Sequence, residues 1–450
     1  MRTLPAVSAA GLARVMLPSM TTTVSSVPNP VGAAGLAPGT DIRSERLRAL
    51  PPFLFDEIDR QKRERIAAGA DVINLGVGDP DQPTPGFIVE AMDRAMRELV
   101  NQQYPAVGGG LKRFRESAAN FMLRRFGVKV DPYRHIVCCI GSKDGIAHLP
   151  WAVTDPGDIV LCPDPAYPVY EIGAVLAHCR VHKLAVSAQS GWKPHFEQIP
   201  AEIARAARLM WLNYPSNPTA ADADADFYAR AIDWTLGTWR ERPERSRGCF
   251  LASDVAYSEL YFDPANRPLS VWQAPNADID STPAIEFHSL SKTFNMTGWR
   301  IGFAVGHPSI ISALASVKAN VDSGVFNAIQ AAGAVALDRF EDPEVEQMRA
   351  LYKARRDVIV PGLRSVGCEI EHEAGPNAGF FVWARTPLET STGRPADSMT
   401  FAARLLREAD TVVVPGAGFS PRGRDYIRIA LTVDVERMKE TVRRLARLKH

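Results

Sequence analysis

The amino-acid sequence has no excess of charge of either sign and no long apolar run. Its 52 lysines and arginines nearly balance its 51 aspartates and glutamates, which leaves a formal net charge of +1. Such an even balance gives no reason to expect nucleic acid or an acidic surface as a partner. No apolar run approaches the roughly 18 residues that a membrane helix needs, so we expect no membrane partner either.

Cysteine is scarce and scattered. The six cysteines form no C-x-x-C pair and no zinc-ligand spacing, so we expect no metal site. Isolated thiols in a chain of this length are typical of buried, reduced side chains, which favours a cytoplasmic protein. The cysteines are at positions 138, 139, 162, 179, 249 and 368.

The first 40 residues differ in composition from the rest of the chain. They contain Arg2 and Arg14 but no acidic residue before Asp41, and they are rich in Ala, Ser, Thr, Pro and Gly. An organelle transit peptide would share the lack of acids but usually carries more arginine. We expect a disordered leader over 1–44, or an over-long start with Met20 as a later initiator.

The remainder predicts an α/β fold with a mainly parallel central sheet covered by helices on both faces, plus a smaller α+β domain. At 450 residues one core is not enough, so we expect two domains. We place an N-terminal arm and part of the small domain at 45–84, the large domain at 85–328 and the small C-terminal domain at 329–450. The expected strands lie within 136–141, 158–170, 181–187, 209–219, 248–262, 284–292 and 301–306, and in FFVWAR and DYIRIALTV.

Two glycine-rich stretches resemble nucleotide-binding loops only partly. GVGDPD (76–81) begins like the G-x-G-x-x-G fingerprint of a dehydrogenase, but Asp81 stands where the third glycine belongs. VGGGLKRF (107–114) lacks the spacing of a P-loop and is better read as a turn into a helix. The prediction of a dehydrogenase would therefore depend on this incomplete motif alone.

Polar side chains gather where the expected strands end, which in such a sheet is the edge that binds ligands. Together they meet the needs of pyridoxal 5'-phosphate: a lysine for covalent attachment, a carboxylate for the pyridine nitrogen, and hydroxyl and amide groups for the 3′ oxygen. A stacking ring and a helix N-terminus with an arginine for the phosphate complete the set. The candidates are Lys292, Asp254, Tyr257, Asn217, Tyr167, Ser142 and Arg300.

These motifs resemble those of the fold-type I, class I and II aminotransferases over about residues 45–445, and most of all the LL-diaminopimelate aminotransferases. The long lysine motif is the most specific. The motifs that carry the resemblance are LPPFLFDEID, GVGDPDQPTP, GSKDGIAHL, PDPAYPVY, NYPSNPT, FHSLSKTFNMTGWRIGFAVG, DSGVF and YIRIALT.

The resemblance implies a homodimeric enzyme of lysine biosynthesis, with the active site at the subunit interface. It implies that Lys292 attaches the cofactor and then moves the proton of the substrate. The cofactor would also be bound by Asp254, Tyr257, Asn217, Tyr167, Ser142, Lys143, Ser289, Ser291 and Arg300, with Tyr104 arriving from the other subunit. The amino-acid and 2-oxo-acid substrates would be bound by Arg428, at the α-carboxylate, and by Gly78, Tyr167, Asn217 and Lys143, the last at the distal end.

Some positions depart from the diaminopimelate pattern. Phe53 and Phe381 replace tyrosines, and Ser216 and Ala220 stand where asparagine and glycine are usual, which leans toward alanine-type enzymes. An alanine:2-oxoglutarate or broad-specificity aminotransferase is therefore the alternative. A regulator that borrows the fold would need an N-terminal DNA-binding domain, and the 40-residue leader is too short for one.

Overall fold

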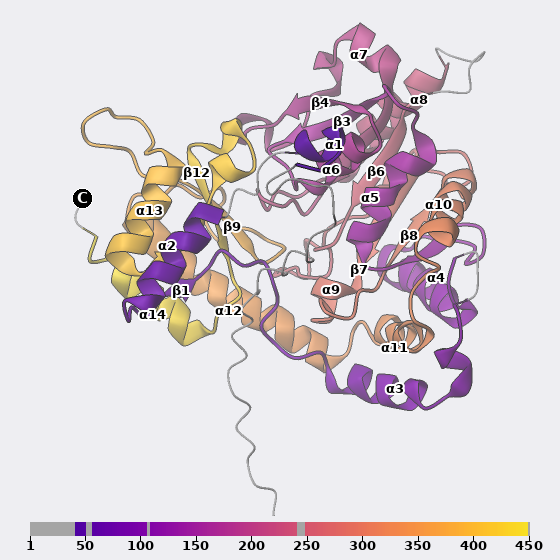
Figure 1. Ribbon diagram of the computed structural model, residues 1–450, viewed down its shortest axis with the longest axis horizontal. Coiled ribbons are helices and arrows are strands. Elements are labelled where there is room, and N and C mark those ends of the chain that lie inside the picture. The colour runs from indigo at the N-terminus through magenta and orange to yellow at the C-terminus, as the bar shows by residue number, and fades with distance from the viewer. Residues whose placement is uncertain (1–40, 51–55, 106–108, 241–247, 449–450) are drawn as a thin grey trace, which may run out of the picture. The chain divides into compact units, whose positions relative to one another are not determined.

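The central feature of the protein is a seven-stranded sheet. The computed structural model describes residues 41–50, 56–105, 109–240 and 248–448. The strand order is β2-β8-β7-β6-β5-β3-β4; β8 is antiparallel to both neighbours and the other pairs are parallel (Figure 1). This confirms the expected fold class. The strands are β2 (Ile136–Cys139), β3 (Ile159–Asp164), β4 (Arg180–Ala185), β5 (Ala207–Asn213), β6 (Phe250–Asp254), β7 (Ala284–Ser289) and β8 (Gly302–Gly306).

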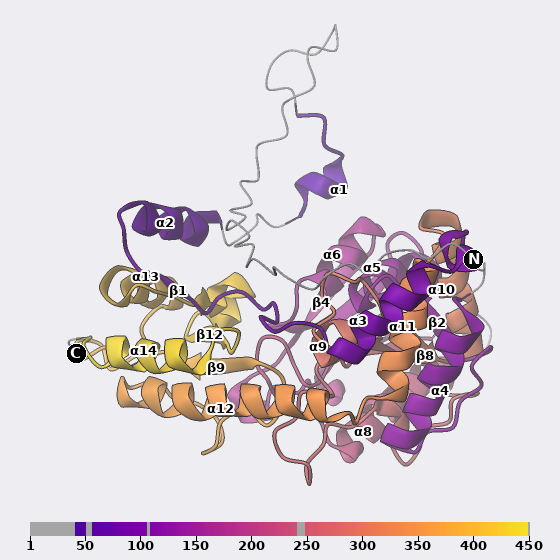
Figure 2. The ribbon, with the colours of Figure 1, turned by 90° about the horizontal axis from the view of Figure 1, so that it is seen from below.

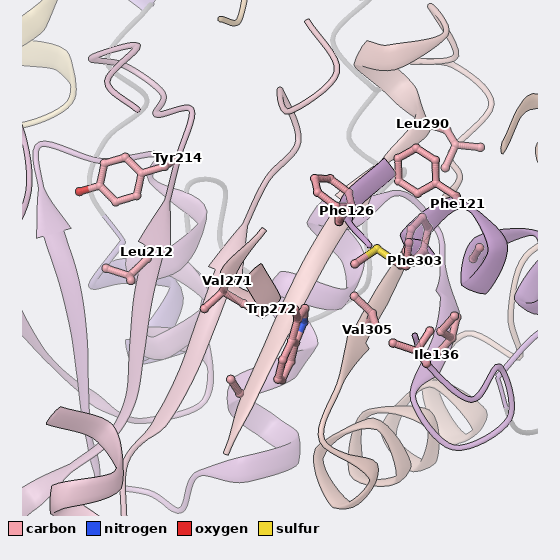
Figure 3. Packing of buried hydrophobic residues seen from close by; sticks show 14 of the residues in the cluster. Phe121, Phe126, Ile136, Leu212, Tyr214, Val271, Trp272, Leu290, Phe303 and Val305 are labelled. Carbon is pink, nitrogen blue, oxygen red and sulfur yellow. The ribbon is translucent and has the colours of Figure 1, made fainter. Parts of the chain in front are cut away.

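The six strands other than β4 are buried on both faces, which explains why they are mostly apolar, whereas β4 lies at the edge and is largely exposed. In β2, Ile136 and Cys138 belong to one core, whereas Val137 and Cys139 belong to another on the opposite face. This division follows from the two-residue period of a strand. Figure 3 shows the first core, where Phe121 meets Phe303 edge to face at a centroid distance of 6.2 Å.

Helices cover the two faces of the sheet (Figures 1 and 2). α11 packs against both α3 and α4, and α5 packs against α6 and α10. The helices are α3 (Gly86–Met96), α4 (Lys112–Phe126), α5 (Ser142–Val153), α6 (Val169–Leu176), α7 (Ala201–Ala206), α8 (Ala225–Arg240), α9 (Leu290–Thr293), α10 (Pro308–Val321) and α11 (Asn327–Asp338). The glycine-rich stretch before α4 forms the expected turn, because Gly109 and Gly110 both have positive φ.

The C-terminal part builds two smaller sheets around a core of its own. An antiparallel sheet has the order β11-β12-β9, and β1 pairs with β10 in a parallel pair. The chain before α3 thus joins the C-terminal part through β1. The elements are α1 (Glu45–Arg48), α2 (Asp56–Ala67), β1 (Ile73–Asn74), α12 (Pro343–Ser365), β9 (Phe381–Arg385), α13 (Ser398–Ala409), β10 (Thr411–Val412), β11 (Val414–Pro415), β12 (Tyr426–Ala430) and α14 (Val435–Leu445).

Several expectations from sequence meet the structure only in part. The expected domain boundaries remain predictions; α11 runs across residue 328 and packs against α3 and α4. The leader, Met20 and Phe53 lie outside the described residues. All six cysteines are free and buried, as expected. Among the described helices, none combines the length and apolar character needed to cross a membrane.

Candidate active site

Lys292 projects from α9, the single helical turn that follows β7. Ser289 caps this turn by accepting a hydrogen bond from the backbone nitrogen of Ser291. The amine of Lys292 donates to the carbonyl of Gly78 at 3.0 Å and lies 5.4 Å from the ring centroid of Phe380. The pKa of this amine is lowered to about 8, mainly by burial and in part by the Arg300 and Arg428 guanidiniums, while Asp79 acts in the opposite direction. A minor but larger neutral fraction than that of an ordinary lysine is therefore available near neutral pH.

Asp254 ends β6 directly beside the end of β5, because Asn213 and Asp254 are register partners. Its carboxyl group is buried, and one oxygen accepts a 2.7 Å hydrogen bond from the hydroxyl of Tyr170. Burial raises the pKa of this carboxyl group to about 6, although the hydrogen bond from Tyr170 lowers it. A buried carboxylate held mainly by a neutral hydroxyl is suited to receive a positively charged ligand group.

An amide network links Asp254 to the next group of side chains. Asn213 donates to the backbone carbonyl of Asp254 at 2.8 Å and accepts from the backbone nitrogen of Asn217 at 2.8 Å. The side-chain oxygen of Asn217 in turn accepts from Arg428 at 2.9 Å. Burial raises the pKa of the neighbouring Tyr257 hydroxyl, which keeps this phenol protonated. Asp254, Asn217, Tyr257 and Arg428 therefore form one buried group.

Arg428 lies in β12 with its guanidinium between two rings. Its centre is 4.2 Å from the ring centroid of Phe381 and 4.9 Å from that of Phe419. One terminal nitrogen donates to Asn217 and the other to the carbonyl of Gly76 at 3.1 Å. Burial lowers the pKa of the guanidinium to about 10, and its Nε has no partner among the described residues. An N–H donor of this cation is therefore left for a ligand.

The start of α5 lies beside Arg300. Ser142 is the first residue of this helix, and Arg300 donates to the hydroxyl of Ser291 at 3.4 Å. Gly141 has a φ of +72°, which favours glycine, and a Cβ atom built there would lie 2.4 Å from Nη2 of Arg300, so the guanidinium packs directly against this backbone. Free N–H groups at a helix start, next to a guanidinium and hydroxyls, are typical of an anion site.

Tyr167 and Lys143 border this anion site. The ring of Tyr167 lies edge to face with Tyr170 at a centroid distance of 5.9 Å. The exposed ammonium of Lys143, the second residue of α5, is 5.9 Å from the ring centroid of Tyr167. Lys143 thus places an exposed positive charge near the ring of Tyr167.

The candidate residues thus fall into contacting groups, with the exception of Tyr104. The Tyr104 side chain is 90% exposed, and it borders a cavity with Pro105, Ser323 and Gly324. Sequence reasoning missed Tyr170 and Phe380, and it identified Phe381 only as a departure from the diaminopimelate pattern. Tyr170 follows Tyr167 by three residues, a helical spacing that could have suggested a shared face.

The residues present fit pyridoxal phosphate on the structural evidence of this chain. The Lys292 amine has a lowered pKa, and Asp254 is a buried carboxyl group without a basic partner among its hydrogen bonds. The helix start at Ser142, with Arg300 packed against Gly141, offers a place for the phosphate.

Comparisons with known proteins agree with this geometry. The profile of the family described as aminotransferase class I and II matches residues 70–445. An LL-diaminopimelate aminotransferase of Aquifex aeolicus is 45% identical over 406 residues, covering 90% of this chain and 99% of the relative. One of Syntrophobacter fumaroxidans is 44% identical, covering 90% and 99%. These matches confirm the resemblance seen in the motifs.

Solved structures share the fold. Substrate-bound BacF from Bacillus subtilis superposes with a TM-score of 0.79 at 33% identity, covering 90% of this chain and 98% of the other. A Thermus thermophilus aspartate aminotransferase double mutant has a TM-score of 0.79 at 26% identity, covering 91% and 100%. The sheet and helices described above are therefore those of known aminotransferases.

We expect the Lys292 amine to titrate well below an ordinary lysine. In cofactor-free protein, reductive methylation of Lys292, followed by peptide mass spectrometry across pH, should give a midpoint near 8. Exposed lysines in the same digests should be half-modified near the usual value of about 10.4. A Lys292 midpoint equal to that of the exposed lysines would contradict the burial argument.

Proposed function

Because the chain belongs to the class I and II aminotransferase family, we propose that it transfers an amino group from L,L-diaminopimelate to 2-oxoglutarate with pyridoxal 5'-phosphate as cofactor. The shared name of the two relatives supports this donor. The observation that carries the proposal is the convergence of the partly buried Lys292 amine and the Arg428 guanidinium on the carbonyls of Gly78 and Gly76, which are two residues apart in one segment.

The cofactor would be held by the groups described above. Lys292 would bind it covalently, and Asp254 would accept a hydrogen bond from its pyridine nitrogen. When bound, pyridoxal phosphate supplies an electron sink for negative charge that develops at the α-carbon of the substrate. The remaining contacts would come from Tyr257 and Asn217 to the 3′ oxygen, from Tyr167 to the ring, and from Ser142, Ser289, Ser291 and Arg300 to the phosphate.

The same residues position the substrate and move its proton. Arg428 binds the α-carboxylate, using its unpartnered Nε and a terminal nitrogen as a fork. The backbone at Gly78 lies beside the substrate. As a neutral amine, Lys292 would take the proton from the α-carbon of the substrate. Its lowered pKa supports this role because a protonated lysine cannot accept a proton.

The distal end of the donor provides the basis for its selection. L,L-diaminopimelate carries a second carboxylate far from the first, which needs a cation away from Arg428. Lys143 meets this need, because its ammonium is exposed and lies beside the ring of Tyr167. Alanine has no such group and would not use this lysine.

A homodimer with shared active sites is part of this proposal. Tyr104 is 90% exposed, and Leu99, Val100 and Phe326 are exposed apolar side chains. A second copy of the chain would cover these residues and bring Tyr104 to the phosphate of the partner site. We place the enzyme in the cytoplasm on the basis of its free cysteines.

Replacing Lys292 tests the covalent role. Purified protein should be yellow, and treatment with borohydride should remove the visible absorbance. Lys292→Ala should lose covalent cofactor and should lose activity by several orders of magnitude, because both the attachment point and the base are gone. Normal turnover by this variant would overturn the assignment.

Replacing Asp254 tests the pyridine-nitrogen role. Asp254→Ala should keep the fold but lower kcat by more than about a thousandfold, since ~4 kcal/mol is reasonable for one buried charge-assisted hydrogen bond in the transition state. Steady-state kinetics and circular dichroism on the same samples separate chemistry from folding. A loss below tenfold would assign the role to another carboxylate.

Replacing Lys143 tests the substrate. L,L-diaminopimelate, alanine, aspartate and glutamate should be assayed side by side with the wild type and Lys143→Ala. We expect the wild type to prefer L,L-diaminopimelate and the variant to lose about tenfold in kcat/KM for this donor selectively.

The other outcomes of this assay are equally informative. An equal loss for alanine would show that Lys143 does not bind a distal group. A wild-type preference for alanine would favour an alanine:2-oxoglutarate aminotransferase instead.

A further inference from the structure

Three consecutive carbonyls in the segment after β1 each accept a hydrogen bond from a different side chain. The carbonyl of Gly76 accepts from Arg428 at 3.1 Å, that of Val77 from Thr432 at 2.7 Å, and that of Gly78 from Lys292 at 3.0 Å. The segment runs from β1 to α3 (Figure 2). Its backbone therefore sets where two candidate active-site cations lie relative to each other.

The same segment is bound to α12 by a paired charge. The two terminal nitrogens of Arg355 donate to the two carboxylate oxygens of Asp81, each at 2.6 Å. Arg355 is 0% exposed, so this guanidinium depends on Asp81 to offset the loss of water. Burial alone would raise the pKa of Asp81, but hydrogen bonds from Arg355 and Gln82 lower it. The pair is charged and bidentate, which fixes orientation as well as distance.

Arg355 also reaches the strand end that carries Thr432. Its Nη1 donates to the carbonyl of Leu431 at 2.9 Å, and Leu431 directly precedes Thr432. One buried guanidinium thus holds both sides of the contact between Thr432 and Val77. Arg428, in β12, lies three residues before Leu431.

The far end of the segment is attached to the chain that follows Lys292. Thr84 donates to the carbonyl of Asn295 at 2.7 Å, and the amide of Asn295 donates to the carbonyl of Pro83 at 3.1 Å. Between Gly78 and Pro83, the position of the backbone depends on the attachment of Asp81 to Arg355. Loss of that attachment would free the Gly76–Gly78 carbonyls to move away from Arg428 and Lys292.

We propose that Asp81 and Arg355 are positioning residues for the carboxylate-binding site. They hold the Gly76–Gly78 carbonyls so that the Arg428 guanidinium keeps one fixed orientation, with its Nε facing the ligand. The inference rests on the proposed role of Arg428 in binding the α-carboxylate. A fork that is free to rotate binds a carboxylate less tightly than one held in place, because binding must then restrict it.

The test compares Asp81→Asn with Asp71→Asn. Asp71 precedes β1 and is exposed, as Asp81 is; it accepts from Arg437 at 2.7 Å and from Arg444 at 2.6 Å, and neither arginine bonds the Gly76–Gly78 carbonyls. Both changes remove one charge and keep the side-chain shape. The measurements are the dissociation constant of 2-oxoglutarate by calorimetry on the protein as purified, kcat and KM for both substrates, and thermal unfolding.

We expect Asp81→Asn to weaken 2-oxoglutarate binding by tenfold or more and to raise KM for donor and acceptor together. Asp71→Asn should bind 2-oxoglutarate with a dissociation constant within twofold of that of the wild type. This should hold even if it lowers the unfolding temperature as much as Asp81→Asn does. Arg355→Lys keeps the charge but loses the planar fork, so it should behave like Asp81→Asn. It takes the place of Asp81→Asn in the test if Asp81→Asn does not fold.

The reference variant Arg428→Lys separates the proposed role of Arg428 in binding the carboxylate from the positioning role of Asp81 and Arg355. Unchanged 2-oxoglutarate binding in Arg428→Lys would contradict the proposed role of Arg428 itself. Weakened binding in Arg428→Lys, with Asp81→Asn and Arg355→Lys both within twofold of the wild type, would overturn the positioning role alone. An equal loss in Asp71→Asn would do the same, since the effect would then be general destabilisation.

Discussion

The hydrogen bond from Lys292 to the carbonyl of Gly78 is the contact on which the site depends. It joins the turn after β7 in the large sheet to the chain that links β1 with α3. Glycine is required at this position, because a Cβ atom on Gly78 would lie 2.8 Å from the ring of Phe381. The backbone can therefore approach Lys292 on one side and pack against an aromatic ring on the other. That ring also covers the guanidinium of Arg428.

Burial, rather than pairing, sets the charge properties of the site. It lowers the pKa values of Lys292 and Arg428 to about 8 and 10 and raises that of Asp254 to about 6. Each pKa shift disfavours the charged form of its group. A ligand group of opposite charge would therefore stabilise the charged form, and without one each group exchanges its proton more readily. A ligand with an anion toward Arg428 and a cation toward Asp254 matches this arrangement. By contrast, Arg355 has its counter-ion in Asp81, which suits a structural role.

The strand-end residues could be predicted from sequence because their positions follow from local rules. Apolar runs mark buried strands, and adjacent parallel strands end at one edge, so Asp254, Asn217 and Lys292 were expected to lie together. The contacts of Arg428 could not be derived in this way. Its partners Asn217 and Gly76 are 211 and 352 residues away in sequence, and no periodicity carries information over such a separation. Before the structure, the place of Arg428 rested on family resemblance.

The pairing of Asp81 with Arg355 illustrates a second limit. In the sequence, Asp81 stands out only as the residue that breaks a glycine fingerprint. Arg355 lies 274 residues further on, in a helix rich in basic residues. Nothing in the sequence distinguishes Arg355 from the adjacent Arg356, which binds Asp357 and the carbonyl of Pro376 instead. Which arginine faces the segment depends on how α12 is rotated in the packed core. That rotation is a property of the assembled fold.

Burial also separates the groups to which we assign the chemistry from Lys143, to which we assign the selection of the substrate. Lys292, Asp254 and Arg428 are largely or fully enclosed, and their orientations are fixed by hydrogen bonds to neighbouring backbone and side chains. Lys143 is exposed at the first turn of α5 and touches the ring of Tyr167. A change at Lys143 leaves the enclosed contacts in place, because none of them includes its side chain. Donor preference can therefore differ among chains that share this core, which is why the buried residues define the reaction more firmly than the substrate.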